Sequence, residues 1–322
     1  MREAPQDVRD MAARRADRRA AKDFSGADEI RERIAQRGWS VVDEPGGWRL
    51  EPADAPAPAG PLRPRDVVSI LDQPAIADVS IHWVVEGWPK DVRRALDSFR
   101  ANVGARDVQY VVADVTGEPG DTWGEGVEVV ALEGGTGWGA ALNAGLKRSR
   151  ARTVLVMDGS VEATGDVLGP LERALADPSI GVCGPFGIVT LDLREFDATE
   201  GPEADAIEGY CMAFRREVLT AAGLFDEKFR WYRTADIEYS FRIKDLGLRA
   251  VVVPVPVERH EHRMWFHTPP ADRARWSKRN FYRFLDRWRD RYDLTVSARP
   301  PAHEHGRDRH GGHEHGPSSG SG

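Results

Sequence analysis

The stretch Val154-Leu-Val-Met-Asp158-Gly-Ser160-Val-Glu162 decides the fold class of this chain. Its apolar residues predict a buried strand, and the acid at the end of that strand is followed at once by the turn residues Gly159 and Ser160. A carboxylate in that place can hold a divalent cation, because hard cations prefer carboxylate oxygens. A solvated turn acid has the same sequence, and these residues alone leave both interpretations open.

Outward from this stretch, short β-rich runs alternate with amphipathic helical runs from about Asp78 onward. Such alternation predicts an α/β fold with a mainly parallel sheet between helices, in which functional groups lie at the carboxyl ends of the strands. The expected strands are residues 79–85, 108–112, 127–132, 153–157, 181–183 and 250–254. The expected helices are residues 89–102, 138–149, 166–176, 215–222, 235–246 and 271–292.

The composition excludes several classes of protein. Among 322 residues, 45 Lys and Arg against 52 Asp and Glu give a formal net charge of −7, which argues against nucleic-acid binding through bulk charge. With 41% hydrophobic and 30% charged residues, and no apolar run near the roughly 20 residues of a membrane span, we expect a soluble globular protein. Two cysteines without a CxxC pair, and no signal peptide, favour the cytoplasm.

The chain is expected to divide into four parts. Residues 1–51 predict a small unit of two helices and a β-hairpin, with a capping box of Ser25 and Asp28 at the second helix. Residues 52–77 predict a Pro- and Ala-rich linker and lead-in, and residues 78–298 the α/β domain with a final amphipathic helix. Residues 299–322, rich in Gly and His, are expected to be disordered.

A second motif, Gly135-Thr-Gly137-Trp-Gly139-Ala140, follows an expected strand and opens an expected helix. With Asp158 further on, it fits a dinucleotide-binding fingerprint, whose backbone N–H groups hold a pyrophosphate at a helix N-terminus. At least two strands precede these glycines, whereas the fingerprint usually opens its domain. Binding of NAD(P) and a tight strand-to-helix turn therefore both stay open.

Two further motifs supply acids and histidines. Asp236 is expected to cap the helix at 235–246 and to reach a cleft, where a carboxylate can serve as general base. The commoner role of such an acid is to stabilise the helix dipole, and Glu238 cannot share its helix face. In Arg259-His260-Glu261-His262-Arg263, alternate histidines of an extended segment face opposite sides, so at most one can meet a given metal.

Taken together, these motifs resemble the inverting family-2 glycosyltransferases with the GT-A fold. The resemblance runs from about Val79 to about Met264 and includes the segments 80–99, 135–145, 208–215 and 223–236. It implies transfer of a sugar from a nucleoside-diphosphate donor to the hydroxyl of a glycan or lipid-linked acceptor, with inversion, in polysaccharide or glycan biosynthesis.

The resemblance also implies roles for single residues. Asp236 matches the catalytic base. The implied donor-binding residues are Glu86, Asp114, Gly135, Gly137, Asn143, Asp158 and Ser160, and the implied acceptor-side residues are Glu208, Tyr210, Trp231 and Tyr232. Asp158, with one histidine of the pair His260 and His262, is implied to hold Mg²⁺ or Mn²⁺.

Three positions depart from the pattern of that family. Ser160 replaces the last acid of the metal motif, Val85-Glu86-Gly87 replaces the usual Thr, Tyr and Asn, and Ala235 replaces the acid before the base. These departures keep an alternative open, a degenerate protein that binds nucleotide-sugars or a partner without turnover.

The two ends of the folded chain suggest partners. Residues 14–51 resemble the C-terminal tail of cysteinyl-tRNA synthetases and indicate a docking module, whose balanced charge gives no pull toward RNA. The helix at 271–292 places Trp276, Phe281 and Trp288 between arginines. This helix either approaches an anionic acceptor or the inner membrane face as a peripheral contact, or packs on the domain with a solvated charged side.

Overall fold

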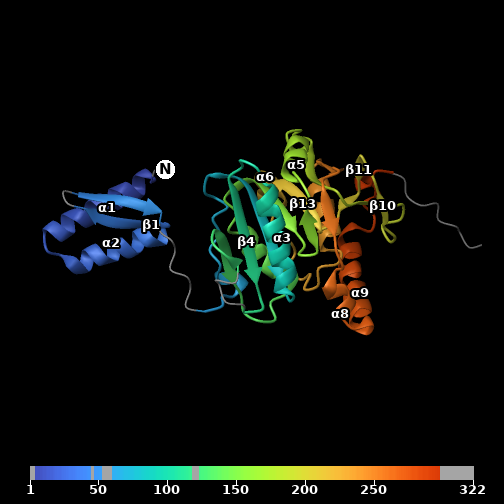
Figure 1. Cartoon of the computed structure of the whole chain (residues 1–322), viewed down its shortest axis with the longest axis horizontal. Coiled ribbons are helices and arrows are strands. Elements are labelled where there is room, and N and C mark those ends of the chain that lie inside the picture. Colours follow the sequence, from blue (N-terminus) through green and yellow to red (C-terminus); the bar gives the residue numbers. More distant parts are fainter. Residues whose placement is uncertain (1–3, 45–46, 53–59, 118–122, 298–322) are drawn as a thin grey trace, which may run out of the picture. The chain divides into compact units, whose positions relative to one another are not determined.

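The structure is a computed structural model that describes residues 4–44, 47–52, 60–117 and 123–297. The chain divides into two compact units, Met1–Gly60 and Pro61–Gly322 (Figure 1). Most of the expected Pro-rich linker, at 53–59, and the expected tail at 299–322 lie outside the described residues.

The smaller unit consists of α1 (Gln6–Ala20), α2 (Phe24–Gln36), β1 (Trp39–Glu44) and β2 (Gly47–Pro52), with the two strands antiparallel. Its core includes Val8, Met11, Ile34 and Trp39. The predicted capping box at Ser25 is wrong, because the helix begins before that residue. Asp23 supplies the cap instead, and its Oδ1 accepts the Gly26 N–H at 3.0 Å.

The larger unit contains these elements: η1 (Pro64–Asp66), β3 (Ala77–Val85), α3 (Pro89–Asn102), β4 (Val108–Asp114), β5 (Val127–Ala131), α4 (Trp138–Leu146), β6 (Ala151–Met157), β7 (Val161–Ala163), α5 (Leu168–Leu175), β8 (Ile180–Gly184), β9 (Gly187–Val189), β10 (Asp197–Thr199), β11 (Glu203–Ala204), β12 (Ala206–Ile207), β13 (Cys211–Arg215), α6 (Arg216–Ala222), α7 (Ala235–Lys244), β14 (Arg249–Val252), β15 (Val257–Arg259), α8 (Arg263–His267), α9 (Pro270–Trp288) and η3 (Tyr292–Leu294). None of the helices in the described ranges is long and apolar enough to cross a membrane.

Eight strands of the described residues form the central sheet, in the order β11-β14-β8-β13-β6-β3-β4-β5 (Figure 1). The pairs β6–β3, β3–β4, β4–β5 and β14–β8 are parallel, whereas β13 is antiparallel to both of its neighbours. The predicted α/β class with a mainly parallel sheet is confirmed. The sequence interpretation missed β13, because its short apolar run leads directly into the helix signal of α6.

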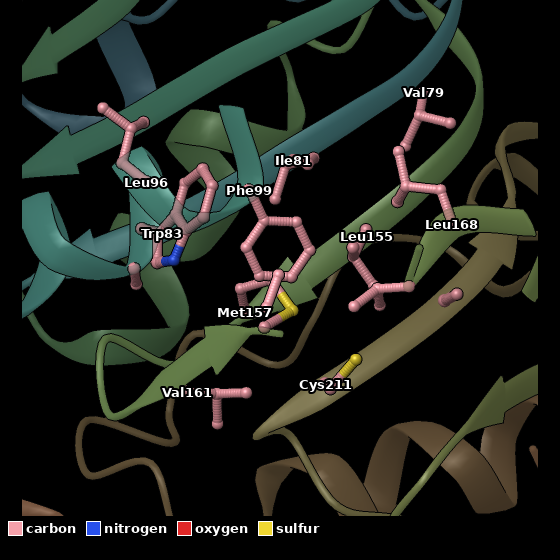
Figure 2. Packing of buried hydrophobic residues seen from close by; sticks show 14 of the residues in the cluster. Val79, Ile81, Trp83, Leu96, Phe99, Leu155, Met157, Val161, Leu168 and Cys211 are labelled. Atoms are coloured by element: carbon pink, nitrogen blue, oxygen red, sulfur yellow. The ribbon is translucent and has the colours of Figure 1, made fainter. Parts of the chain in front are cut away.

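Alternation along the strands buries both faces of the sheet. On β3, Ile81 and Trp83 face the layer of α3 and α5, where Phe99 meets Trp83 edge to face with ring centroids 5.9 Å apart. Figure 2 shows this layer. On the opposite face, Leu142 and Tyr239 bring α4 and α7 against the sheet. Because helices cover both faces, the strand ends remain the place for a site.

Candidate functional site

The candidate site lies where β6 ends and β13 begins. Because these strands are antiparallel, the residues that precede β13 meet those that follow β6: Cys211 lies opposite Met157, and the Asp158 N–H donates to the Tyr210 carbonyl oxygen at 3.1 Å. Asp158, Tyr210 and Glu208 therefore line the same cavity.

The start of α7 brings a second carboxylate to this cavity. Thr234, with φ of +72°, is the N-cap residue, so Asp236 lies in the first turn and the expected capping role of Asp236 is wrong. Its Oδ2 instead accepts the Gly209 N–H at 2.8 Å, across the cavity wall. Asp158 and Asp236 thus line one cavity. Glu238 points elsewhere and pairs with Arg242 and Arg287.

Of the residues implied by the resemblance, six meet in the cavity: Asp158, Glu208, Tyr210, Tyr232, Asp236 and His262. Arg233 and Thr234 also line it and were missed. Their position between Tyr232 and Asp236 in the sequence is the signal that could have found them. Trp231 does not belong to this set, because its buried ring packs on Trp276 with centroids 5.1 Å apart.

Burial changes the pKa values of Glu208 and Asp236. Burial raises the pKa of Asp236, and the N–H groups of Gly209 and Ile237 oppose that rise by stabilising the carboxylate. Burial, together with the nearby Asp236 charge, raises the pKa of Glu208 to about 7. The cavity therefore holds two carboxyl groups that are easier to protonate than exposed ones.

Asp158 is stabilised as an anion by its neighbours. Its Oδ1 accepts the Ser160 backbone N–H at 2.8 Å and the Ser160 hydroxyl at 2.5 Å, and its Oδ2 lies 3.1 Å from His262 Nε2. Burial acts to raise the Asp158 pKa, but these hydrogen bonds outweigh it and hold the pKa below its usual value. Tyr232 stacks at a tilt on the His262 ring, with centroids 4.4 Å apart, and fixes its position.

The pair Asp158 and His262 fits a divalent cation only in part. The described residues contain no cluster of three or more His, Cys, Asp or Glu side chains around one point. The 3.1 Å between Asp158 Oδ2 and His262 Nε2 nevertheless matches the roughly 3 Å between adjacent ligands of an octahedral ion with bonds of about 2.1 Å. Such an ion would take its remaining ligands from water and a bound diphosphate.

His260 does not share this site. Its Nε2 lies 2.8 Å from Glu162 Oε1, and its ring lines a different cavity together with Asp91 and Arg94. The metal role implied for His260 is therefore wrong. As expected from their alternate positions, only one of the two histidines reaches Asp158.

Glu86 and Asp114 lie at the ends of adjacent strands. Val85 is opposite Asp114, and the buried Asp114 Oδ1 accepts the N–H and hydroxyl of Thr116 at 2.7 and 2.6 Å. Glu86 Oε2 is buried and has no hydrogen-bond partner among the described residues. Burial, with the Asp158 charge nearby, raises the Glu86 pKa to about 8. Both acids lie outside the lining of the cavity.

The glycine motif serves the fold. A Cβ on Gly137 would lie 2.9 Å from Arg230 Cα, and the N–H groups of Trp138 and Gly139 donate to the carbonyls of Arg230 and Phe229. Two N–H donors at the start of α4 are thus already used by another segment of this chain, which disfavours the NAD(P) interpretation. The donor role implied for Gly135 and Gly137 stays a prediction.

Asn143 also has a structural role. Its side chain is buried and both donates to the Phe225 carbonyl oxygen at 2.8 Å and accepts the Phe225 N–H at 2.9 Å. Its Nδ2 also lies 3.4 Å from Glu227 Oε1, so the amide joins α4 to residues 225–227. The donor-binding role implied for Asn143 stays a prediction.

Comparison with known families identifies the larger part of the fold. Residues 89–238 match the model of the glycosyl transferase family 2. This region, just under half of the chain, is similar to a glycosyl transferase family 2 domain. The predicted resemblance to this family is confirmed, and the matched residues include α3, the start of α7 and the cavity lining except Val84 and His262.

One solved glycosyltransferase structure shares the fold of the larger unit. The crystal structure of GalNAc-T7 with UDP, GalNAc and Mn²⁺ aligns with a TM-score of 0.54 and 16% identity, over 68% of this chain and 50% of that chain. The mannosyltransferase PcManGT from Pyrobaculum calidifontis, in complex with GDP-Man and Mn²⁺, aligns with a TM-score of 0.48 and 20% identity, over 69% of this chain and 67% of that one. The first alignment confirms the GT-A-like fold.

A second, shorter similarity is to a different kind of enzyme. A stretch of 51 residues is 45% identical to cysteine–tRNA ligase of Opitutus terrae, which confirms the predicted resemblance to that enzyme. The match covers 16% of this chain and 11% of the ligase. The chain thus spans half the length of GalNAc-T7 and a ninth of the ligase.

Proposed function

We propose that this protein is a glycosyltransferase that moves a sugar from a nucleoside-diphosphate donor to an acceptor hydroxyl, with inversion at the anomeric carbon. The observation that carries the proposal is one cavity in which Asp158, from the end of β6, and Asp236, from the start of α7, both present carboxylates. The match to family 2, which includes both residues, supports it.

Asp236 is the proposed general base. The Gly209 N–H keeps its carboxylate in place, and burial makes it a better proton acceptor than an exposed aspartate. Asp236 takes the proton of the acceptor hydroxyl while the oxygen attacks the anomeric carbon from the face opposite the leaving diphosphate. A single displacement of this kind inverts the configuration.

Asp158 and His262 are the proposed ligands of Mg²⁺ or Mn²⁺, and GalNAc-T7, which shares the fold, was crystallised with Mn²⁺. The ion would offset the negative charge that builds up on the diphosphate. Ser160 orients the Asp158 carboxylate through two hydrogen bonds. Glu86 and Asp114, at the ends of β3 and β4, would contact the nucleoside.

A second candidate function is binding of nucleotide-sugars without turnover. It is favoured by Ser160, which replaces a charged ligand and already occupies one oxygen of Asp158, and by Ala235 beside the proposed base. The same assay separates the two functions.

The test measures release of nucleoside diphosphate from a panel of nucleotide-sugars by the wild type and by Asp236→Asn. We expect the variant to lose about 100-fold or more of the rate, because a general base contributes that much. Stabilisation of the fold by the nucleoside diphosphate should be retained. Asp226→Asn, which removes a carboxylate outside the cavity lining, is the control. Equal rates would remove Asp236 as base, whereas ligand binding without turnover by the wild type would establish the second candidate.

A further inference from the structure

Three arginines near the cavity have no carboxylate and no hydrogen-bond partner for their guanidinium groups within the described ranges: Arg233, Arg259 and Arg273. Aromatic rings hold them instead. Arg233 and Arg273 both lie 4.7 Å from the centroid of Trp265, and Arg259 lies 4.8 Å from that of Tyr210. A guanidinium that contacts a ring with its face keeps the N–H donors at its edge free for a ligand.

Other arginines close to these three are paired with carboxylates. Arg263, close in sequence to Arg259, lies 3.1 Å from Asp91, and Arg283 on α9 lies 3.3 Å from Asp226. The chain as a whole has a net charge of −7, so carboxylates are in excess. Free guanidinium edges beside a cavity, in a protein rich in acids, point to an anionic ligand.

The position of Arg233 and Arg259 indicates which of the two substrates carries the anionic group. Burial raises the pKa of both Glu208 and Asp236, and the Arg233 charge acts against the rise at both groups. The Arg259 charge acts in the same way on Glu208 and Tyr210. The groups that act most on Asp158 are His262 and Ser160. The geometry agrees for the acceptor-side acids. Arg233 lines the cavity together with Asp236 and Glu208. Arg259 lies 5.3 Å from the ring centroid of Phe186, whose carbonyl oxygen accepts the Glu208 N–H at 2.8 Å.

We propose that the acceptor carries an oxyanion, either a phosphate or a carboxylate, and that Arg233 and Arg259 bind it beside Asp236. This inference rests on the proposed glycosyltransferase function, which assigns the Asp236 side to the acceptor. The planar fork of a guanidinium matches the two oxygens of such a group. Anchoring of the anion holds the acceptor hydroxyl within reach of the base.

The experiment is calorimetric titration of the full chain with inorganic phosphate, glucose 6-phosphate and glucuronate, with glucose as the neutral comparison and UDP as a donor-side probe. We expect at least one of the anions to bind and glucose not to bind. Arg233→Gln and Arg259→Gln should each weaken anion binding about tenfold or more and leave UDP affinity unchanged. Arg289→Gln, which removes an exposed arginine paired with Asp286, should change neither.

Two outcomes would overturn the inference. If the wild type binds none of the anions, the arginines are not an oxyanion site. If the two variants weaken UDP binding instead, these arginines hold the donor diphosphate. The titration measures binding and needs no turnover, so it tests the two proposals separately. If the protein has no transferase activity but binds an anion through Arg233, the glycosyltransferase proposal is contradicted and the oxyanion site is still supported.

Discussion

Both oxygens of Asp158 are engaged, one by Ser160 and the other by His262. These contacts are compatible with two roles for Asp158, because they orient a metal ligand and they also form an ordinary turn. Asp177 forms the same local turn with Ser179, whose N–H and hydroxyl donate to it at 2.9 and 2.7 Å, but Asp177 lies at an exposed place. Comparison of the two residues separates metal binding from turn formation.

We expect Asp158→Ala to lose most of the donor turnover and EDTA to have the same effect on the wild type, because the diphosphate charge would no longer be offset. Added Mn²⁺ should restore the EDTA-treated wild type and leave Asp158→Ala inactive. Asp177→Ala should remain active and metal-dependent. The measurement is release of nucleoside diphosphate, and full activity of the wild type in EDTA would remove the metal from the mechanism.

The raised pKa of Glu86 makes the stability of the folded protein depend on pH. Its folded-state pKa of about 8 lies above the ordinary value of 4.5, so the folded protein binds this proton more tightly than the unfolded chain. The stability that the proton provides is complete below pH 4.5 and is lost as the pH rises through 8.

Glu86→Gln cannot ionise, so we expect it to match the wild type within about 1 kcal/mol at pH 5 and to exceed it at pH 8.5 by on the order of 4 kcal/mol in free energy of unfolding. Denaturant unfolding at the two pH values measures this. Glu125→Gln, at an exposed position, should show no such trend. A wild type that keeps its stability relative to Glu86→Gln up to pH 8.5 would contradict the raised pKa.

At the scale of elements, α4 meets the segment before α7 backbone to backbone. A Cβ on Gly139 would lie 2.9 Å from the Asp226 carbonyl oxygen and 3.0 Å from that of Phe229, and the Gly139 N–H donates to the Phe229 carbonyl. This contact positions the chain that leads into Asp236. The glycine is required by a neighbouring segment of protein and not by a ligand.

Gly139→Ala should therefore destabilise the larger unit by about 1–3 kcal/mol, because the surrounding backbone has no room for the methyl group. Gly134→Ala, where nothing lies within 4 Å of the added Cβ, should have little effect on stability. Thermal unfolding of both variants checks this, and equal transition temperatures would mean that α4 can shift without cost.

Sequence patterns predicted the elements whose signals are local. Pro89 at the first helical position and Asn102 bound α3 as expected. The resemblance to the family-2 glycosyltransferases also pointed to Asp158, Glu208, Asp236 and His262, which meet in one cavity. Local patterns could not predict which groups hydrogen-bond to each other. The glycines at 135–140 and Asn143 have the residue types of a ligand site, but residues 225–230 contact the glycine backbone and hydrogen-bond the Asn143 amide. The aromatic contacts of Arg233 likewise depend on α8.

At the scale of the whole molecule, two units have separate cores. In the smaller one, Arg15 is only 2% exposed, and its guanidinium makes two hydrogen bonds to Asp43, at 2.8 and 3.0 Å. That ion pair joins α1 to the hairpin.

Asp43→Asn should destabilise the smaller unit by about 1–3 kcal/mol, since it leaves a buried guanidinium without its charge partner. We expect two transitions in scanning calorimetry, with only that of the smaller unit moving and the UDP-sensitive one unchanged. Asp17→Asn, at an exposed position on α1, is the matched control. A joint shift of both transitions would show that the units unfold together.

The reversed direction of β13 has a consequence for protein engineering. One wall of the cavity is formed by the residues that follow β6, and another by the residues before β13 and at the start of α7. The chain between β6 and β13 includes β7, α5, β8 and the short strands β9 to β12, and its segment 187–207 contributes only Ile188 and Phe196 to the cavity lining. Under the proposed function, replacing residues 187–207 with the matching segment of a relative would change which acceptor is used while Asp158 and His262 stay in place.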